Sequence, residues 1–80
     1  MGGHISTGYD VIGPSQTTIT EPRKYAWFVV STAGSLIFTD LEGTTHTKTV
    51  AIGDEINCMI KSLDSGNTAV LEGYIRGDNL

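Results

Sequence analysis

The chain has 80 residues, a formal net charge of −4 and only five lysines and arginines. A domain this short buries only about 60% of the surface of its unfolded chain, so we expect oligomerisation to add stability. The scattered cations are too few to neutralise a run of phosphates, which excludes nucleic acid and an anionic membrane surface as expected partners. No apolar stretch approaches the about 20 residues of a membrane-spanning helix. The first residues lack the pattern of a secretory signal, so we expect synthesis in a reducing cytoplasm.

The first segment, residues 1–14, contains four glycines, one proline and isolated apolar residues without a regular period. We interpret this segment as an extended N-terminal arm that precedes a single β-domain over residues 15–80. Ile5, Tyr9, Val11 and Ile12 give the arm more apolar surface than a linker usually has. We therefore expect these four side chains to contact a neighbouring protein, with a disordered arm as the alternative.

From residue 15 onward, short segments rich in Val, Ile, Thr and aromatic residues alternate with Gly, Asp and Asn, a pattern typical of successive strands. Six strands are predicted, over residues 16–20, 24–32, 35–41, 44–52, 55–63 and 68–76. The short connections favour antiparallel hairpins, and no window shows an apolar stripe at helical spacing. The sequence therefore predicts an all-β fold, a small antiparallel sandwich or barrel of about six strands with an extended N-terminal arm.

The segment 25–30 is apolar on both faces of its predicted strand. Tyr25, Trp27 and Val29 share one face, and three further apolar residues share the other. Because a lone sandwich covers only one face of a strand, we expect Tyr25, Trp27 and Val29 to form an oligomer interface. By contrast, residues 44–49 are polar on both faces and predict an edge strand or a projecting hairpin.

The sequence offers little for catalysis. The single cysteine, Cys58, cannot form an internal disulfide, and the two histidines lack the further ligands of a zinc site. Cys58 shares a predicted face with Ile56 and Ile60, where a thiolate is disfavoured, so we interpret it as a core residue rather than as the partner of His46. Acidic residues at the turns are expected to solvate loops, with a calcium site as the alternative. We therefore expect no enzyme, no metal and no cofactor.

Three stretches of the sequence carry a resemblance to a known family. They are Pro14-Ser15-Gln16-Thr17-Thr18, the first predicted hairpin at Thr32-Ala33-Gly34, and Ser65-Gly66-Asn67-Thr68-Ala69 before the last strand. With the apolar strand between the first two, they resemble the head spike base proteins of tailed phages and gene transfer agents over most of residues 14–74. The resemblance implies a symmetric homo-oligomer, a trimer or a pentamer, on the capsid exterior. Its implied partners are the major capsid protein or another virion protein, and its synthesis takes place in the host cytoplasm.

Two functions follow as expectations. The first is a virion structural protein, a cement, decoration or head spike base protein whose arm contacts a neighbouring subunit or the shell. The alternative is a module that recognises a host glycan or receptor through Trp27, Tyr74 or residues 44–49. The tripeptide Arg76-Gly77-Asp78 matches an integrin-recognition motif, but we interpret it as the end of the last strand.

Overall fold

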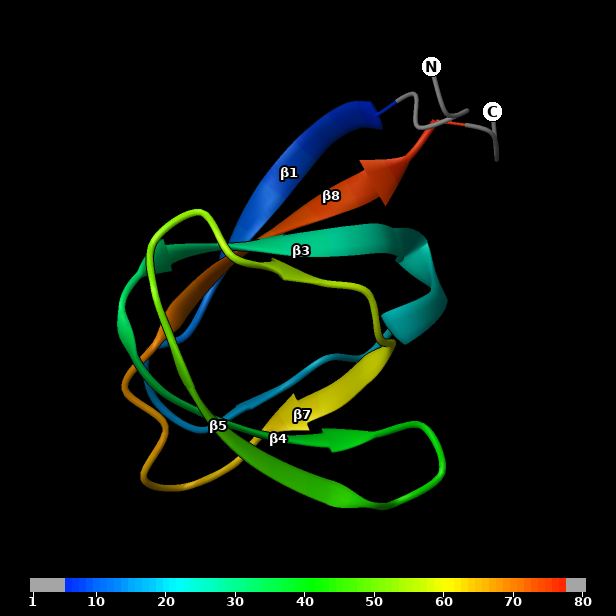
Figure 1. Cartoon of the computed structure of the whole chain (residues 1–80). Helices are drawn as coiled ribbons and strands as arrows, with labels where there is room; N and C mark the ends of the chain where they lie inside the picture. The colour runs from blue at the N-terminus through cyan, green and yellow to red at the C-terminus, as the bar shows by residue number, and fades with distance from the viewer. Residues whose placement is uncertain (1–5, 78–80) are drawn as a thin grey trace.

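The computed structural model describes residues 6–77, which form an all-β fold of two antiparallel four-stranded sheets (Figure 1). The first sheet has the order β1-β8-β3-β6 and the second has the order β2-β7-β4-β5. The strands are β1 (Ser6–Ile12), β2 (Thr17–Thr18), β3 (Tyr25–Thr32), β4 (Gly34–Asp40), β5 (Thr45–Val50), β6 (Glu55–Ile56), β7 (Ile60–Leu63) and β8 (Val70–Arg76). The predicted all-β antiparallel architecture is confirmed, and the sheets form a sandwich that does not close into a barrel.

Most connections carry the chain from one sheet to the other, which corrects the expectation of successive hairpins. Within residues 6–77, β4 and β5 are the one pair of consecutive strands that lie side by side in the same sheet. At Thr32-Ala33-Gly34 the chain turns a corner between the sheets instead of forming a hairpin. The corner packs closely against the loop before β8, because a Cβ added at Gly34 would lie 2.5 Å from Thr68 Oγ1. Strands that change sheets at such corners are a known feature of β-sandwiches.

The N-terminal segment differs from the expected arm. Residues 6–12 form strand β1, which pairs antiparallel with β8 and belongs to the first sheet. The domain boundary expected at residue 14 is therefore wrong for the described part of the segment. The partner strand lies at the other end of the chain, so no local pattern near β1 indicates this pairing.

The predicted strand over residues 55–63 is also divided. β6 pairs with β3 in the first sheet, whereas β7 pairs with β4 and β2 in the second sheet. Between β2 and β3, residues Pro22–Lys24 form a single 3-10 turn, labelled η1. No helix among residues 6–77 is long and apolar enough to cross a membrane.

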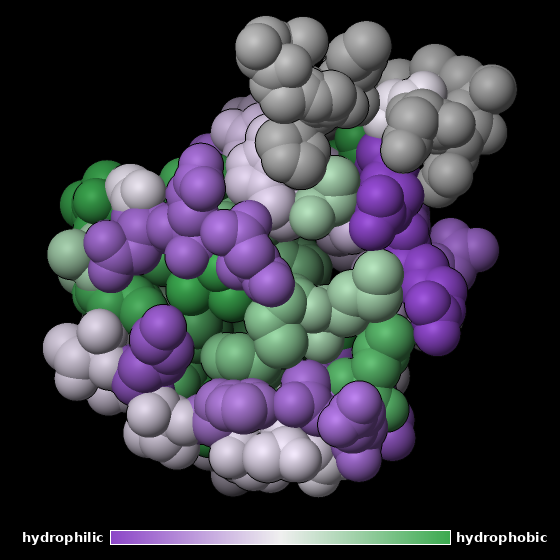
Figure 2. Space-filling view, turned by 45° about the vertical axis from the view of Figure 1, so that its right-hand side comes forward, coloured by the Kyte–Doolittle hydropathy of each residue, from purple (hydrophilic) through white to green (hydrophobic). Residues whose placement is uncertain are grey.

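The core lies between the sheets and takes side chains from both. The largest side chains with almost no exposed surface are Phe28, Leu36, Ile60, Leu63, Leu71 and Val30. Burying one such side chain contributes about 1.5–3 kcal/mol to stability. Figure 2 shows that hydrophobic surface is also visible in a hollow between polar side chains, where the sandwich remains open.

One buried polar residue joins β4 to the loops that precede β2 and β8. The Asn67 side chain accepts a hydrogen bond from the Ile37 backbone N–H (3.1 Å) and donates to the Ala69 carbonyl (2.9 Å). It also donates to the carbonyl oxygen of Pro14. Asn67 is only 5% exposed, so these bonds satisfy polar groups that water cannot reach.

Candidate interaction surface

Three aromatic rings lie side by side on the outer face of the first sheet. Tyr74 on β8 is directly opposite Tyr9 on β1 and directly opposite Trp27 on β3. Its ring centroid lies 5.2 Å from that of Tyr9 and 5.1 Å from that of Trp27, with the Trp27 and Tyr74 rings only 3° from parallel. We call these three residues the aromatic row. Cross-strand pairs of this kind stabilise a sheet and present a broad, rigid surface.

A second row runs beside the aromatic row on the same face. It consists of Val11, Glu72, Val29 and Glu55, which are paired in that order across all four strands of the first sheet. Val11 is 65% exposed and Tyr9 is 51% exposed. We call the two rows together the outer face, a partly apolar surface with carboxylates between its apolar side chains. The exposed apolar side chains of this face make it the candidate interaction surface.

A hydrogen bond connects the two rows. The Tyr74 hydroxyl donates to Glu72 Oε1 over 2.8 Å. This hydrogen bond is the main reason that the pKa of Tyr74 is raised, because ionisation of the phenol would remove the donor. Both side chains are therefore held in place on the outer face without a partner chain.

The outer face combines residues from two separate sequence predictions. Trp27 and Val29 were expected at an oligomer interface, and Tyr9 and Val11 were expected to contact a neighbour through the arm. Strand β8, which lies between β1 and β3, brings all four onto one surface. Whether another chain contacts them stays a prediction.

Tyr25 does not share this face, which corrects its assignment beside Trp27 and Val29. Tyr25 is paired with Ile75, and Trp27 is paired with Tyr74. Two residues of β3 therefore lie opposite one residue step of β8, which leaves Ala26 as the extra residue. This β-bulge at Ala26 reverses the alternation of side chains. Tyr25 therefore points into the core and is only 8% exposed.

Strand β1 likewise divides the residues predicted for the arm. Ile12 is 5% exposed and belongs to the core of its own chain, so it is not available as a contact to a neighbour. The alternation that directs Tyr9 and Val11 outward directs Ile12 inward. Ile5 lies outside the described residues.

Tyr25 takes part in a polar cluster at the edge of the first sheet. Its hydroxyl donates to Asp10 Oδ2 over 2.6 Å, and Lys24 Nζ lies 3.3 Å from the same oxygen. Burial is the main cause that raises the pKa of Tyr25 to about 12, and the hydrogen bond to Asp10 adds to it. The same hydrogen bond is the main cause that lowers the pKa of Asp10.

A cleft of about 170 Å³ opens beside this cluster, between β1 and the chain around β2. Its lining is formed by Asp10, Val11, Ile12, Thr17, Thr18, Ile19, Thr20, Glu21, Lys24 and Tyr25. These side chains hold no histidine or cysteine, so the cleft has no thiol or imidazole nucleophile. The cleft lies between β1 of the first sheet and β2 of the second sheet.

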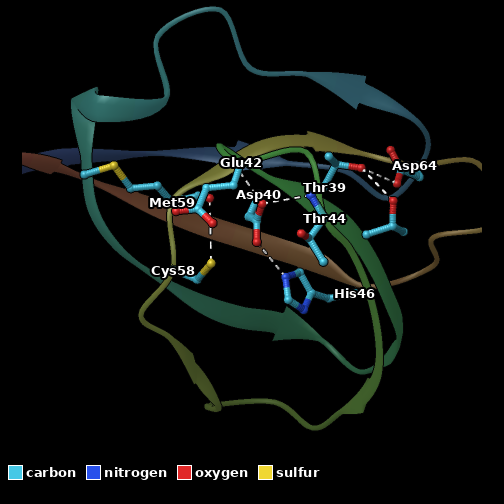
Figure 3. A network of polar contacts seen from close by, with 9 residues as sticks. Thr39, Asp40, Glu42, Thr44, His46, Cys58, Met59 and Asp64 are labelled. Carbon is cyan, nitrogen blue, oxygen red and sulfur yellow. Dashed lines mark hydrogen bonds and ion pairs between the residues drawn. The ribbon is translucent and has the colours of Figure 1, made fainter.

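The groups with most potential for chemistry gather at the β4–β5 turn (Figure 3). Asp40 accepts hydrogen bonds from the backbone N–H groups of Glu42 (2.9 Å) and Thr44 (3.0 Å), and Nε2 of His46 lies 2.8 Å from its other oxygen. The His46 ring also stacks on Phe38, with centroids 4.8 Å apart. These contacts hold the turn closed, and the bond to His46 is the main cause that lowers the pKa of Asp40.

Cys58 lies close to this turn but is directed elsewhere. Cys58 is half-buried and packs against the core, in agreement with the inward orientation that the sequence predicted. Its thiol donates a hydrogen bond to the Met59 carbonyl over 3.7 Å. Burial raises the pKa of the Cys58 thiol, which disfavours the reactive thiolate. No group of three or more metal-ligating side chains occurs within residues 6–77.

The second sheet has a solvent-facing side of different chemistry from the outer face of the first sheet. Thr18, Ser62, Thr39 and Thr45 lie side by side across β2, β7, β4 and β5. β5 is an edge strand, as the polar segment 44–49 predicted. The outer face of the first sheet therefore carries aromatic rings, whereas the solvent-facing side of the second sheet carries hydroxyl groups.

No family model matches the chain, and no curated protein matches it. Among solved structures, the chain is similar to a chain described as part of the "capsid of native GTA particle computed with C5 symmetry", where GTA denotes a gene transfer agent. The two chains share 28% sequence identity and superpose with a TM-score of 0.69. The similarity covers 88% of this chain and 83% of that chain, so it extends over nearly the whole fold.

Proposed function

We propose that this chain is a virion structural protein, a cement, decoration or head spike base protein on the exterior of a phage-type capsid. The observation that carries the proposal is the similarity to a chain of a gene transfer agent capsid, at 28% identity over 88% of this chain. The similarity supports a capsid-associated protein with a structural rather than an enzymatic role. The resemblance of its turn sequences to head spike base proteins points in the same direction.

In this proposal the protein is a symmetric homo-oligomer that also contacts the major capsid protein or another virion protein. Three or five copies suit the threefold and fivefold positions of a shell. The outer face supports self-association, because aromatic residues are enriched in the centres of protein interfaces. Tyr9 and Val11, on the edge strand β1, extend this surface toward a neighbouring subunit or the shell.

The substitution Val29→Lys tests the role of the outer face. Val29 lies between Glu72 and Glu55 in register, so the folded chain accommodates a lysine there while its charge interrupts the apolar surface. Thr47→Lys on the exposed side of β5 is the matched control. We expect Val29→Lys to reduce incorporation into purified particles and Thr47→Lys to leave it unchanged. Equal incorporation of both folded variants would contradict a contact through this face.

Glycan or receptor recognition is the second candidate function, and the aromatic row favours it because aromatic rings stack on sugars. A glycan array with the isolated protein distinguishes the two. Binding that is lost on Trp27→Ala and retained in Lys61→Ala, at an exposed position of β7, would support recognition of a glycan through the aromatic row. Absence of binding, together with incorporation into particles, would support the purely structural role.

A further inference from the structure

We propose that the outer face of one chain binds the outer face of a second copy. The two copies are related by a twofold axis that lies between the two sheets, parallel to their planes and perpendicular to the strands. In this arrangement the two β8 strands lie antiparallel, one above the other. The inference goes beyond the proposed function, because it adds a twofold contact between two chains to the contacts that close a ring of three or five. A ring of three or five chains needs contacts between two different surfaces, whereas this contact joins the same surface twice.

The first argument is the order of charges along β8. Leu71 and Gly73 point into the core, so Glu72, Tyr74 and Arg76 point outward. Read along the strand, the outward side chains are an acid, an aromatic ring and a base. An antiparallel copy reads base, aromatic ring and acid, which is the complementary order.

The second argument is that neither Glu72 nor Arg76 forms an ion pair with another residue of the described range 6–77. The ion pairs among the described residues join Lys24 to Asp10 and His46 to Asp40. Glu72 accepts the hydrogen bond from Tyr74, and Arg76 Nε donates to the Arg23 carbonyl over 3.1 Å. Both charges therefore remain available to opposite charges on another chain.

The third argument separates the two face-to-face pairings that twofold symmetry allows. With the axis perpendicular to the strands, Glu72 of each chain faces Arg76 of the other, and the two Tyr74 rings meet near the axis. With the axis parallel to the strands, Glu72 faces Glu72 and Arg76 faces Arg76. Like charges opposite each other across an interface disfavour association, so the antiparallel pairing is favoured.

The aromatic row fits the centre of this contact. Tyr9 and Trp27 flank Tyr74 at the same level of the sheet, so the symmetry places the row of one chain on the row of the other. Sheets that pack face to face are about 10 Å apart, a distance that interdigitated rings can fill. The contact then has an aromatic centre with charge pairs on both sides, as interfaces commonly have.

Charge reversal tests the geometry directly, with the mass in solution measured by analytical ultracentrifugation from micromolar to millimolar concentration. Glu72→Arg alone, or Arg76→Glu alone, places like charges opposite each other at both positions. We expect each single variant to weaken the dimer by at least about tenfold. The double variant Glu72→Arg/Arg76→Glu restores the complementary order and is expected to form dimers again.

A mixture of the two single variants is the most specific measurement. One face then carries two arginines and the other carries two glutamates, so we expect a heterodimer although neither variant pairs with itself. Thr47→Lys controls for a change in surface charge, and circular dichroism confirms that each variant folds.

Three results would overturn the twofold pairing: a wild-type monomer at all concentrations, a trimer or pentamer whose mass the single variants leave unchanged, or a mixture that stays monomeric. None of these results contradicts the proposed virion role, because that role is tested separately by incorporation into particles. Conversely, loss of the virion role with an intact dimer would reject the proposed function and retain the contact.

Discussion

Tyr25 on β3 reaches across Gly73 of the intervening strand β8 and donates a hydrogen bond to Asp10 on β1. Asp10 is directly opposite Gly73 in the register of β1 and β8. A glycine at this position leaves room for the Tyr25 ring, and the ring covers a site that has no side chain of its own. This contact connects the predicted arm to the centre of the first sheet.

Replacing Gly73 by alanine is expected to destabilise the fold. An added Cβ would lie 2.9 Å from Tyr25 Cδ1 and 3.0 Å from both Ile12 Cδ1 and Phe28 Cε2. Overpacking of this kind costs about 1–3 kcal/mol. The free energy of unfolding, measured by denaturant titration, should fall by this amount, whereas Thr47→Ala on the surface should change it little. An unchanged stability for Gly73→Ala would show that the Tyr25 ring does not pack there.

Replacing Tyr25 by phenylalanine should weaken the attachment of β1. The variant loses the hydrogen bond to Asp10, and because Asp10 is partly exposed we expect a cost of about 1 kcal/mol. Proteolysis near β1 should increase more than the loss of global stability explains. A variant with wild-type stability and wild-type proteolysis would contradict the role of this bond.

Alkaline pH provides a second test of Tyr25. The pKa of Tyr25 is raised from 10.0 to about 12, so the folded state favours the neutral phenol. Its contribution to stability is complete below pH 10 and is lost as the pH rises toward 12. Titration by tyrosinate absorbance should show one transition near pH 12 that Tyr25→Phe removes. Persistence of that transition in the variant would assign it to another tyrosine.

Asn67→Ala should destabilise the sandwich by about 1–3 kcal/mol, because it leaves the Ile37 N–H and the Pro14 and Ala69 carbonyls without their partner. Asn67→Asp retains the acceptor oxygen and loses the amide donors, so it separates the two contributions. Thermal unfolding by circular dichroism measures both. Equal stability of Asn67→Ala and the wild type would argue against Asn67 as the link between β4 and the loops that precede β2 and β8.

At acid pH the β4–β5 turn should weaken. The pKa of Asp40 is lowered from 3.8, chiefly by the hydrogen bond from His46, so the turn is stabilised above this pH. That stabilisation is lost as the pH falls below 3.8 and the carboxylate takes up a proton. Asp40→Asn should lower the melting temperature at neutral pH and flatten its acid dependence. A parallel decrease in both proteins would contradict this role for Asp40.

The sequence predicted elements whose signals are local and missed those that depend on distant partners. Segments rich in Val, Ile, Thr and aromatic residues, bounded by Gly, Asp and Asn, were sufficient to predict β3, β4, β5 and β8 within residues 24–32, 35–41, 44–52 and 68–76. Ile56, Cys58 and Ile60 continue one alternation across the gap between β6 and β7, so the pattern concealed the change of sheet. No residue pattern in the sequence indicates the bulge at Ala26, so Tyr25 was assigned to the wrong face.

The outer face could be predicted only in parts. Trp27 and Val29 were named from a predicted strand that is apolar on both faces, and Tyr9 and Val11 were named as isolated apolar residues of the expected arm, so the sequence separates the two pairs. Only the register of β8 shows that Tyr74 lies between them. The charge order along β8 depends on the same register, so the twofold contact needed the structure.

The number of copies of the wild-type chain in purified particles tests the central claim most directly. Quantitative mass spectrometry of particles, separated from free protein by density, would measure this number against the major capsid protein. The proposed virion role predicts a fixed ratio set by the symmetry of the shell. Absence of the chain from intact particles, with all of it recovered as free protein, would contradict that role.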